Sequence, residues 1–122
     1  MGTATEGSGP RPFLIDPISM RLSHIGIAVP DPELLKKFFE ILGAKTSHIE
    51  DVPEQKVQTH FIPVTNAGAT VHVELLVSQD SNGPVGTFLA KKGPGVHHLS
   101  FELASGSLES ACARLTQGGF RL

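Results

Sequence analysis

Hydrophobic and polar residues alternate along residues 24–29, HIGIAV, in the pattern of a half-buried strand. Ile25, Ile27 and Val29 form an apolar face, whereas the opposite face carries one histidine and two very small residues. So little side-chain volume on one face is typical of a close backbone approach or of a cavity wall. We therefore expect a strand with one packed face and one open face.

A helix is predicted directly after this strand. Asp31 and Pro32 are typical of a helix start, and Gly43 is typical of a helix end. The apolar positions between them have helical spacing and predict a buried stripe. Its members are Leu34, Leu35, Phe38, Phe39, Ile41 and Leu42.

Three further strand candidates follow this helix. They lie at roughly residues 45–51, 57–64 and 70–77, and turn-forming residues separate them. The first part of the chain therefore has the predicted order β-α-β-β-β. A short helix is expected near residues 85–92, in the connection to the next strand.

The same pattern returns 74 residues later, where His98 matches His24 and Leu108 matches Leu34. A strand at residues 97–103 is followed by an amphipathic helix with a glycine stop, and only four residues come after Gly118. The buried stripe expected on this helix is Leu108, Ala111, Cys112 and Leu115. These features predict two copies of one module, with three strands of the second copy missing.

The predicted fold class is therefore α+β, with paired βαβββ modules of which the second is incomplete. Residues 1–20 are small, polar and rich in proline, and we expect them to form a flexible arm. Residues 21–122 form the predicted domain. It consists of a first module at 22–78, a connection at 79–96 and a partial second module at 97–122.

Composition narrows the classes of partner. The net charge is −2 and basic residues form no run, so we expect no nucleic-acid partner. Apolar runs are too short to cross a bilayer, so we expect no membrane partner. The only cysteine, Cys112, cannot form an internal disulfide and is predicted to pack in a helix. These features favour a cytoplasmic protein.

Three residues are candidate metal ligands. His24 and His98 occupy equivalent positions of the repeat, and Glu74 lies within an apolar strand. Two imidazoles and a carboxylate suit a divalent transition metal that keeps positions open for a substrate. Each residue also has a plainer interpretation, as a surface histidine or a solvated glutamate. His72 shares a face with Glu74 and is a reserve ligand, whereas His97 is expected to face away from His98.

Several segments together resemble the methylmalonyl-CoA epimerase family of the vicinal oxygen chelate superfamily. They are HIGIAVPD, the PEQ turn, VELL and TFLAKKGPGVHHLSFEL. The resemblance implies a cupped sheet around a divalent metal ion (cobalt, manganese or zinc) held by His24, Glu74 and His98. It also implies a small-molecule acyl-CoA substrate and a homodimer. The family's fourth ligand belongs to a final strand beyond residue 122. A glutamate that some members use as a base falls on Thr59, so no catalytic residue is assigned.

The function implied by this resemblance is metal-dependent interconversion of the two epimers of methylmalonyl-CoA. A base would remove the α-proton, and an acid would return a proton on the opposite face. Three alternatives remain open at this point. They are a non-catalytic binding or sequestering domain, another glyoxalase-like metalloenzyme of the same fold, and an inactive fragment.

Overall fold

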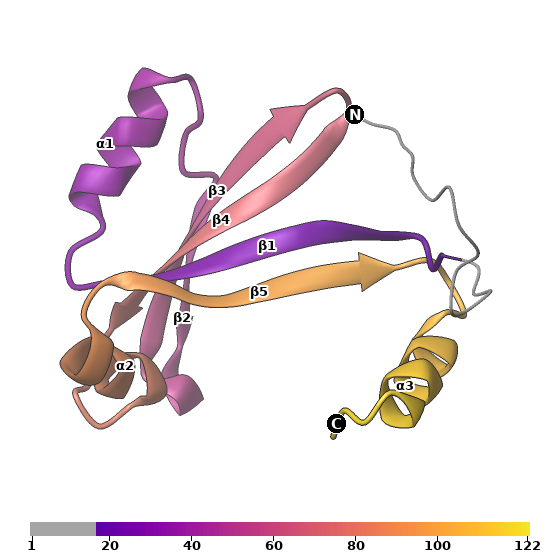
Figure 1. The fold of residues 1–122 in the computed structure, drawn as a ribbon. Coiled ribbons are helices and arrows are strands. Elements are labelled where there is room, and N and C mark those ends of the chain that lie inside the picture. The colour runs from indigo at the N-terminus through magenta and orange to yellow at the C-terminus, as the bar shows by residue number, and fades with distance from the viewer. Residues whose placement is uncertain (1–16) are drawn as a thin grey trace. The chain divides into compact units, whose positions relative to one another are not determined.

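The computed structural model describes residues 17–122, which fall into two compact units. The larger unit, Met20–Glu102, contains a five-stranded sheet and two helices (Figure 1). Most of the predicted arm, residues 1–16, lies outside the described residues. In order, the elements are β1 (Met20–Val29), α1 (Glu33–Ile41), β2 (His48–Val52), a 3-10 turn (Pro53–Gln55), β3 (Val57–Asn66), β4 (Ala69–Ser78), α2 (Pro84–Lys92) and β5 (Gly95–Leu103).

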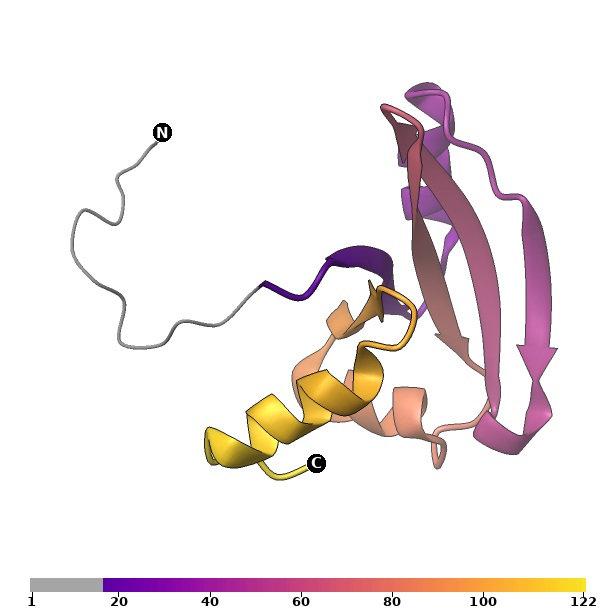
Figure 2. The same ribbon diagram turned by 90° about the vertical axis from the view of Figure 1, so that its right-hand side faces the viewer.

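The order β1-α1-β2-β3-β4 confirms the predicted element order β-α-β-β-β. The strands lie in the spatial order β2-β3-β4-β1-β5. Pairs β2–β3 and β3–β4 are antiparallel, and β1 pairs in parallel with β4. Strands β2, β3 and β4 run side by side and curve along their length (Figure 2). Because Gly26 of β1 and Phe61 of β3 both lie opposite Glu74 of β4, this glutamate is at the middle of the sheet.

The two faces of the sheet carry separate apolar clusters. The cluster beside α1 contains Val29, Ile62, Val73 and Leu75, with Leu35 and Phe39 of the helix packed against it. The cluster beside α2 contains Ala28, Val57, Leu76 and Val85, with Phe88 and Leu89 packed against it. Helices α1 and α2 therefore cover opposite faces, and the alternation seen in HIGIAV decides which residues of β1 face each helix.

Helix α1 does not bury its whole apolar stripe, so that prediction is wrong. Leu35 and Phe39 pack on the sheet, whereas Leu34 and Ile41 are 78% and 74% exposed. The apolar residues form two neighbouring rows along this short helix. Only the row that contains Leu35 and Phe39, which are one turn apart, contacts the sheet. The other exposed members are Phe38 and Leu42.

The predicted ends of α1 agree better with the structure. A carboxylate oxygen of Asp31 accepts a hydrogen bond from the backbone N–H of Glu33 at 3.0 Å, although Pro32 holds the cap position. Gly43 has φ +93°, a left-handed conformation that side chains disfavour. The chain can therefore turn from the helix toward β2.

The smaller unit comprises residues 103–122 together with the described residues 17–19. It contains α3 (Leu108–Gln117), which confirms the predicted helix after β5. The N–H of Ala104 donates to the carbonyl of Ser19 at 2.9 Å. Leu108 and Leu115 are exposed, contrary to the expected buried stripe, because the described residues of this unit include no other helix or strand layer to cover them.

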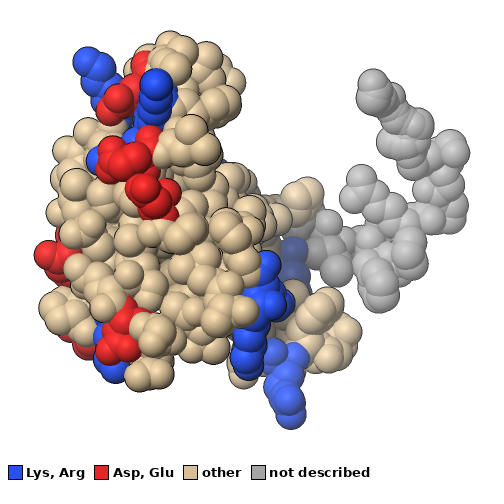
Figure 3. Space-filling view, turned by 90° about the vertical axis from the view of Figure 1, so that its left-hand side faces the viewer, with Lys and Arg blue, Asp and Glu red and all other residues tan. Residues whose placement is uncertain are grey.

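Charged side chains are scattered over the face shown in Figure 3. Figure 3 shows acidic and basic residues in small separate groups, divided by uncharged surface. Within residues 17–122, no helix has both the length and the apolar character needed to cross a bilayer.

Candidate metal centre

The structure brings His24, Glu74 and His98 together on the face of the sheet that α2 partly covers. One ligand atom from each residue lies within 4.8 Å of the other two. Nε2 of His24 is 3.2 Å from Nε2 of His98, and Nδ1 of His24 is 3.4 Å from a carboxylate oxygen of Glu74. Parallel pairing of β1 with β4 and the adjacency of β5 to β1 produce this cluster.

These donors fit a divalent transition metal ion. Two nitrogens that each bind a tetrahedral ion at about 2.0–2.1 Å lie about 3.3 Å apart, which matches the separation of the two Nε2 atoms. The set is two imidazoles and one carboxylate, which suits zinc, cobalt or manganese. Because three residues do not fill a coordination sphere, positions would remain for a substrate.

Gly26 makes the space that the His98 ring occupies. A Cβ atom built at Gly26 would lie 2.3 Å from Cε1 of His98 and 2.8 Å from its Nε2. Real Cβ atoms do not approach other atoms so closely. The small-residue face noted in HIGIAV therefore lines this candidate metal centre.

His97 contacts the ring of His98 at Nδ1, the nitrogen that does not face His24. The Nδ1 atoms of the two rings are 2.9 Å apart, and the His97 ring meets Phe88 of α2 edge to face. Because Nδ1 of His98 contacts His97, Nε2 is the ring nitrogen of His98 that faces His24. Second-sphere contacts commonly orient metal-binding histidines in this way. His97 was expected to face away, but its ring turns toward the same cavity at the start of β5.

Burial shifts the pKa of two members of the cluster. Burial raises the pKa of the Glu74 carboxyl above its usual value, and the nearby His24 partly opposes this. Burial also lowers the pKa of His98, and the neighbouring histidines His24 and His97 lower it further. The neutral imidazole of His98 is the form that can bind a metal ion.

A cavity of about 340 Å³ extends from the candidate metal centre. Val57, Leu76 and Val85 contribute apolar surface to its wall, and two of the three candidate ligands, Glu74 and His98, also line it. The cavity-lining residues of β3 and β4 are every second residue of each strand, so they lie on one face of the sheet. This face forms part of the cavity wall. A largely apolar cavity with few polar groups is typical of a small-molecule site.

Glu50 is a cavity residue that the sequence reasoning missed. It lies on β2, directly opposite Thr59 of β3, and both residues line the cavity. The resemblance had drawn attention to Thr59, where no carboxylate is present. Alternation along HIEDV could have identified Glu50, since it places this residue on the same face as His48 and Val52.

The other histidines lie outside the three-ligand cluster. His60 is only 4% exposed and faces the opposite side of the sheet, where its Nε2 is 2.8 Å from the amide oxygen of Gln58. Burial lowers the pKa of His60, with Lys36 as a further cause. His72, the reserve ligand, lines a separate surface pocket with Arg21.

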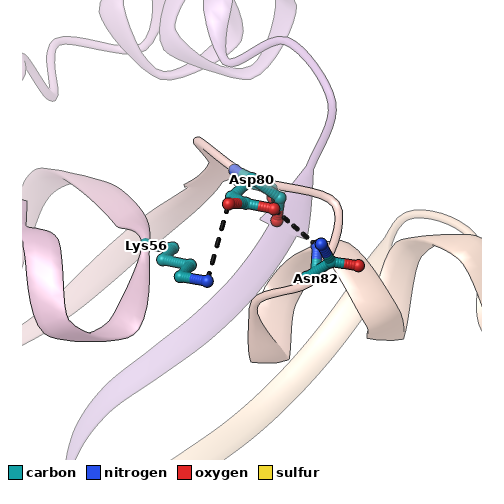
Figure 4. Close-up of polar contacts among 4 residues, drawn as sticks. Lys56, Asp80 and Asn82 are labelled. Atoms are coloured by element: carbon teal, nitrogen blue, oxygen red, sulfur yellow. Dashed lines mark hydrogen bonds and ion pairs between the residues drawn. The ribbon is translucent and has the colours of Figure 1, made fainter.

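Polar contacts of Lys56, Asp80 and Asn82, called the polar latch below, hold the end of the 3-10 turn against the loop before α2 (Figure 4). Nζ of Lys56 is 3.5 Å from a carboxylate oxygen of Asp80, and the N–H of Gln79 donates to the carbonyl of Lys56 at 2.9 Å. Asp80 also accepts a hydrogen bond from the N–H of Asn82 at 2.8 Å. Because Gln55 and the first residues of α2 line the cavity, the latch fixes part of its wall.

Replacement of Asp80 by asparagine is expected to destabilise the fold at neutral pH, with the loss disappearing in acid. The hydrogen bond from Asn82 and the charge of Lys56 lower the pKa of Asp80 below its ordinary value of 3.8. A carboxylate with a lowered pKa stabilises the fold above 3.8, and this contribution is lost as the pH falls through its folded-state pKa. Urea unfolding at about pH 7 and about pH 3 measures the difference. A deficit of equal size at both values would contradict this explanation.

Comparisons with known proteins identify the family of this chain. Residues 23–122 match the glyoxalase/bleomycin resistance protein/dioxygenase superfamily. The chain is 44% identical over 82 residues to the uncharacterized protein YqjC of Bacillus subtilis, which covers 66% of this chain and 56% of YqjC. It is 39% identical over 85 residues to the mitochondrial methylmalonyl-CoA epimerase of Mus musculus, which covers 68% and 46%. The chain thus spans about half the length of these curated relatives.

A longer match is found with another relative. The chain is 33% identical over 104 residues to the ethylmalonyl-CoA/methylmalonyl-CoA epimerase of Cereibacter sphaeroides, and the match covers 84% of this chain and 73% of that protein.

Solved structures show the same fold. A variant of Streptomyces coelicolor methylmalonyl-CoA epimerase in complex with 2-nitronate-propionyl-CoA has a TM-score of 0.64 at 30% identity, covering 83% of this chain and 73% of that chain. A methylmalonyl-CoA epimerase in complex with methylmalonyl-CoA and NH4+ has a TM-score of 0.65 at 30% identity, covering 84% and 72%. With the α+β class confirmed and 100 residues matched, the chain belongs to the glyoxalase/bleomycin resistance protein/dioxygenase superfamily, also called the vicinal oxygen chelate superfamily.

Proposed function

We propose that this chain carries the site of a methylmalonyl-CoA epimerase, which interconverts the two epimers through proton exchange at the α-carbon. The observation that carries the proposal is a cluster of three candidate metal ligands, two of which line a cavity that is also lined by a further carboxylate, that of Glu50. Relatives and structural neighbours named as epimerases support the same activity.

The residues that would hold the divalent metal ion are His24, Glu74 and His98. When bound, the ion would supply positive charge that stabilises an enolate formed next to a thioester. The apolar wall formed by Val57 and Leu76 would exclude water from the reacting carbon. The chain's own contribution is thus to orient the substrate against the ligands and to shield it.

Glu50 is the residue that we propose to transfer the α-proton. It shares the cavity with Glu74 but does not belong to the three-ligand set, so its carboxylate would not be occupied by the metal ion and could act as a base. Its charge also contributes to raising the pKa of Glu74, as expected for two carboxylates facing one space. The absence of a carboxylate at Thr59 therefore no longer favours a non-catalytic binding domain.

Exchange of the α-proton with solvent tests this assignment. With methylmalonyl-CoA and cobalt in heavy water, the wild-type chain should incorporate deuterium, as measured by mass spectrometry. Glu50→Gln should slow incorporation by about 100-fold or more, because general acid–base groups contribute about 10²–10⁴ in rate. Glu54→Gln, on the neighbouring turn, serves as the control for loss of one negative charge. Equal rates for Glu50→Gln and the wild type would exclude Glu50, and no exchange by the wild type would exclude the epimerase activity.

The choice of cobalt, manganese or zinc, the homodimer and the cytoplasmic location stay predictions. The donor set of the candidate centre supports any of the three metals. Native mass spectrometry of the cobalt-loaded chain would report the bound metal and the number of copies together.

A further inference from the structure

We propose that His48 is a positioning residue that shares one proton with Glu50 and passes that proton between the cavity and solvent. This inference rests on the proposed role of Glu50 and extends it to the path by which the proton leaves. His48 and Glu50 are both on β2, two residues apart, so their side chains project from the same face of the strand.

The position of the His48 ring is fixed by three contacts. The ring stacks on Phe61 with centroids 4.2 Å apart and planes 8° apart, and Phe61 itself lines the cavity. Nε2 of His48 is 3.5 Å from a carboxylate oxygen of Glu50. Nδ1 of His48 is 3.1 Å from Oγ of Ser47. The ring therefore lies between a cavity carboxylate and a surface hydroxyl.

Ser47 determines which ring nitrogen of His48 carries hydrogen. The Ser47 hydroxyl donates its only hydrogen to the carbonyl of Phe61 at 3.2 Å, so toward His48 it can only accept. Nδ1 of His48 must then be the donor, which leaves Nε2 as the acceptor of the neutral ring. An acceptor nitrogen that faces a carboxylate is favourable only when one proton lies between them.

This arrangement gives a balanced route for the proton. A proton that Glu50 has taken from a substrate carbon leaves the carboxyl oxygen and binds Nε2 of His48. The resulting imidazolium releases a proton to water, and a reversal of these steps recharges Glu50. The side chains of His48 and Glu50 are 53% and 59% exposed, so water reaches the outer end of the pair. No other reactant is required.

The tautomer of His48 tests the pairing without any substrate. Long-range proton–nitrogen NMR of the cobalt-free chain should show hydrogen on Nδ1 of neutral His48. Ser47→Ala should lose this preference, because the acceptor for Nδ1 is then removed. A neutral His48 ring in the wild type with hydrogen on Nε2 and none on Nδ1 would overturn the proposal.

Proton exchange tests the relay itself. His48→Phe preserves the stack on Phe61 but removes both ring nitrogens, and it should lower kcat by about 10-fold while leaving KM within about two-fold. His48→Ala should recover rate when imidazole is added, since the small molecule can occupy the vacated space against Phe61. Glu50→Gln should show no such recovery.

Two results would overturn the relay: an unchanged kcat in His48→Phe, or a rise in KM with kcat preserved. A wild-type chain that exchanges no α-proton would instead exclude the proposed function. Because the tautomer measurement needs neither substrate nor metal, the failure of the His48 pairing and the failure of the epimerase activity can be told apart.

Discussion

Gly26→Ala is expected to weaken cobalt binding at the candidate metal centre by about 100-fold or more, although it adds only a single methyl group. The new Cβ atom would lie 2.3 Å from Cε1 of His98, so the ring has to move. Displaced ligands or disrupted ligand support commonly cost about 10–100-fold in metal affinity, and here the ligand itself is displaced. Calorimetric titration of the metal-free chain with cobalt measures the effect.

Gly95→Ala is the matched control for this experiment. Gly95 begins β5, the strand that carries His98, and a Cβ atom built there meets nothing within 4 Å. Its cobalt affinity should equal that of the wild type. Wild-type affinity in Gly26→Ala, with the fold verified by circular dichroism, would show that His98 is not needed for the metal.

Leu75→Ala is expected to lower the free energy of unfolding by about 2–5 kcal/mol, the range for large-to-small substitutions in a core. Leu75 is fully buried in the cluster that joins β1, β3 and β4 to α1. Removal of its side chain leaves a cavity that the central strands cannot readily fill, because β4 is paired on both edges. Urea unfolding followed by circular dichroism measures the change.

Leu34→Ala is the control for the core substitution. Leu34 is also a leucine of the predicted apolar pattern, but it is 78% exposed on α1. Its replacement should change stability by no more than about 0.5 kcal/mol. Losses of similar size in the two variants would mean that Leu34 is buried in solution, for example against another molecule.

Local patterns were sufficient to predict most of the fold. Alternation in HIGIAV identified β1, turn-forming residues separated the strands that include β4, and Asp31, Pro32 and Gly43 marked the ends of α1. Such signals are local because side-chain period, caps and turns depend on near neighbours in the chain. The depth of burial was less predictable: Leu34 and Leu35 are adjacent and equally apolar, yet only Leu35 contacts the sheet.

The candidate site could be predicted in part for the same reason. The repeat offset linked His24 with His98, and its place within an apolar strand made Glu74 a candidate; the resemblance then implied the same three ligands. Neither source gave the roles proposed for Glu50 and His48, because these depend on the pairing of β2 with β3 and on which residues line the cavity. His97 was misjudged because its ring follows the contact with Phe88 rather than strict strand alternation.

The sequence by itself determined the element order, the small-residue face of β1 and the types of residue available as ligands. Only the tertiary structure decided that Gly26 makes room for His98, that Glu50 shares a cavity with Glu74, and that His48 lies between Glu50 and Ser47. The physical reason is that hydrophobic period and turn chemistry act over a few residues. Ligand distances and cavity walls instead depend on which strands become neighbours, and that is settled by the packing of the whole sheet.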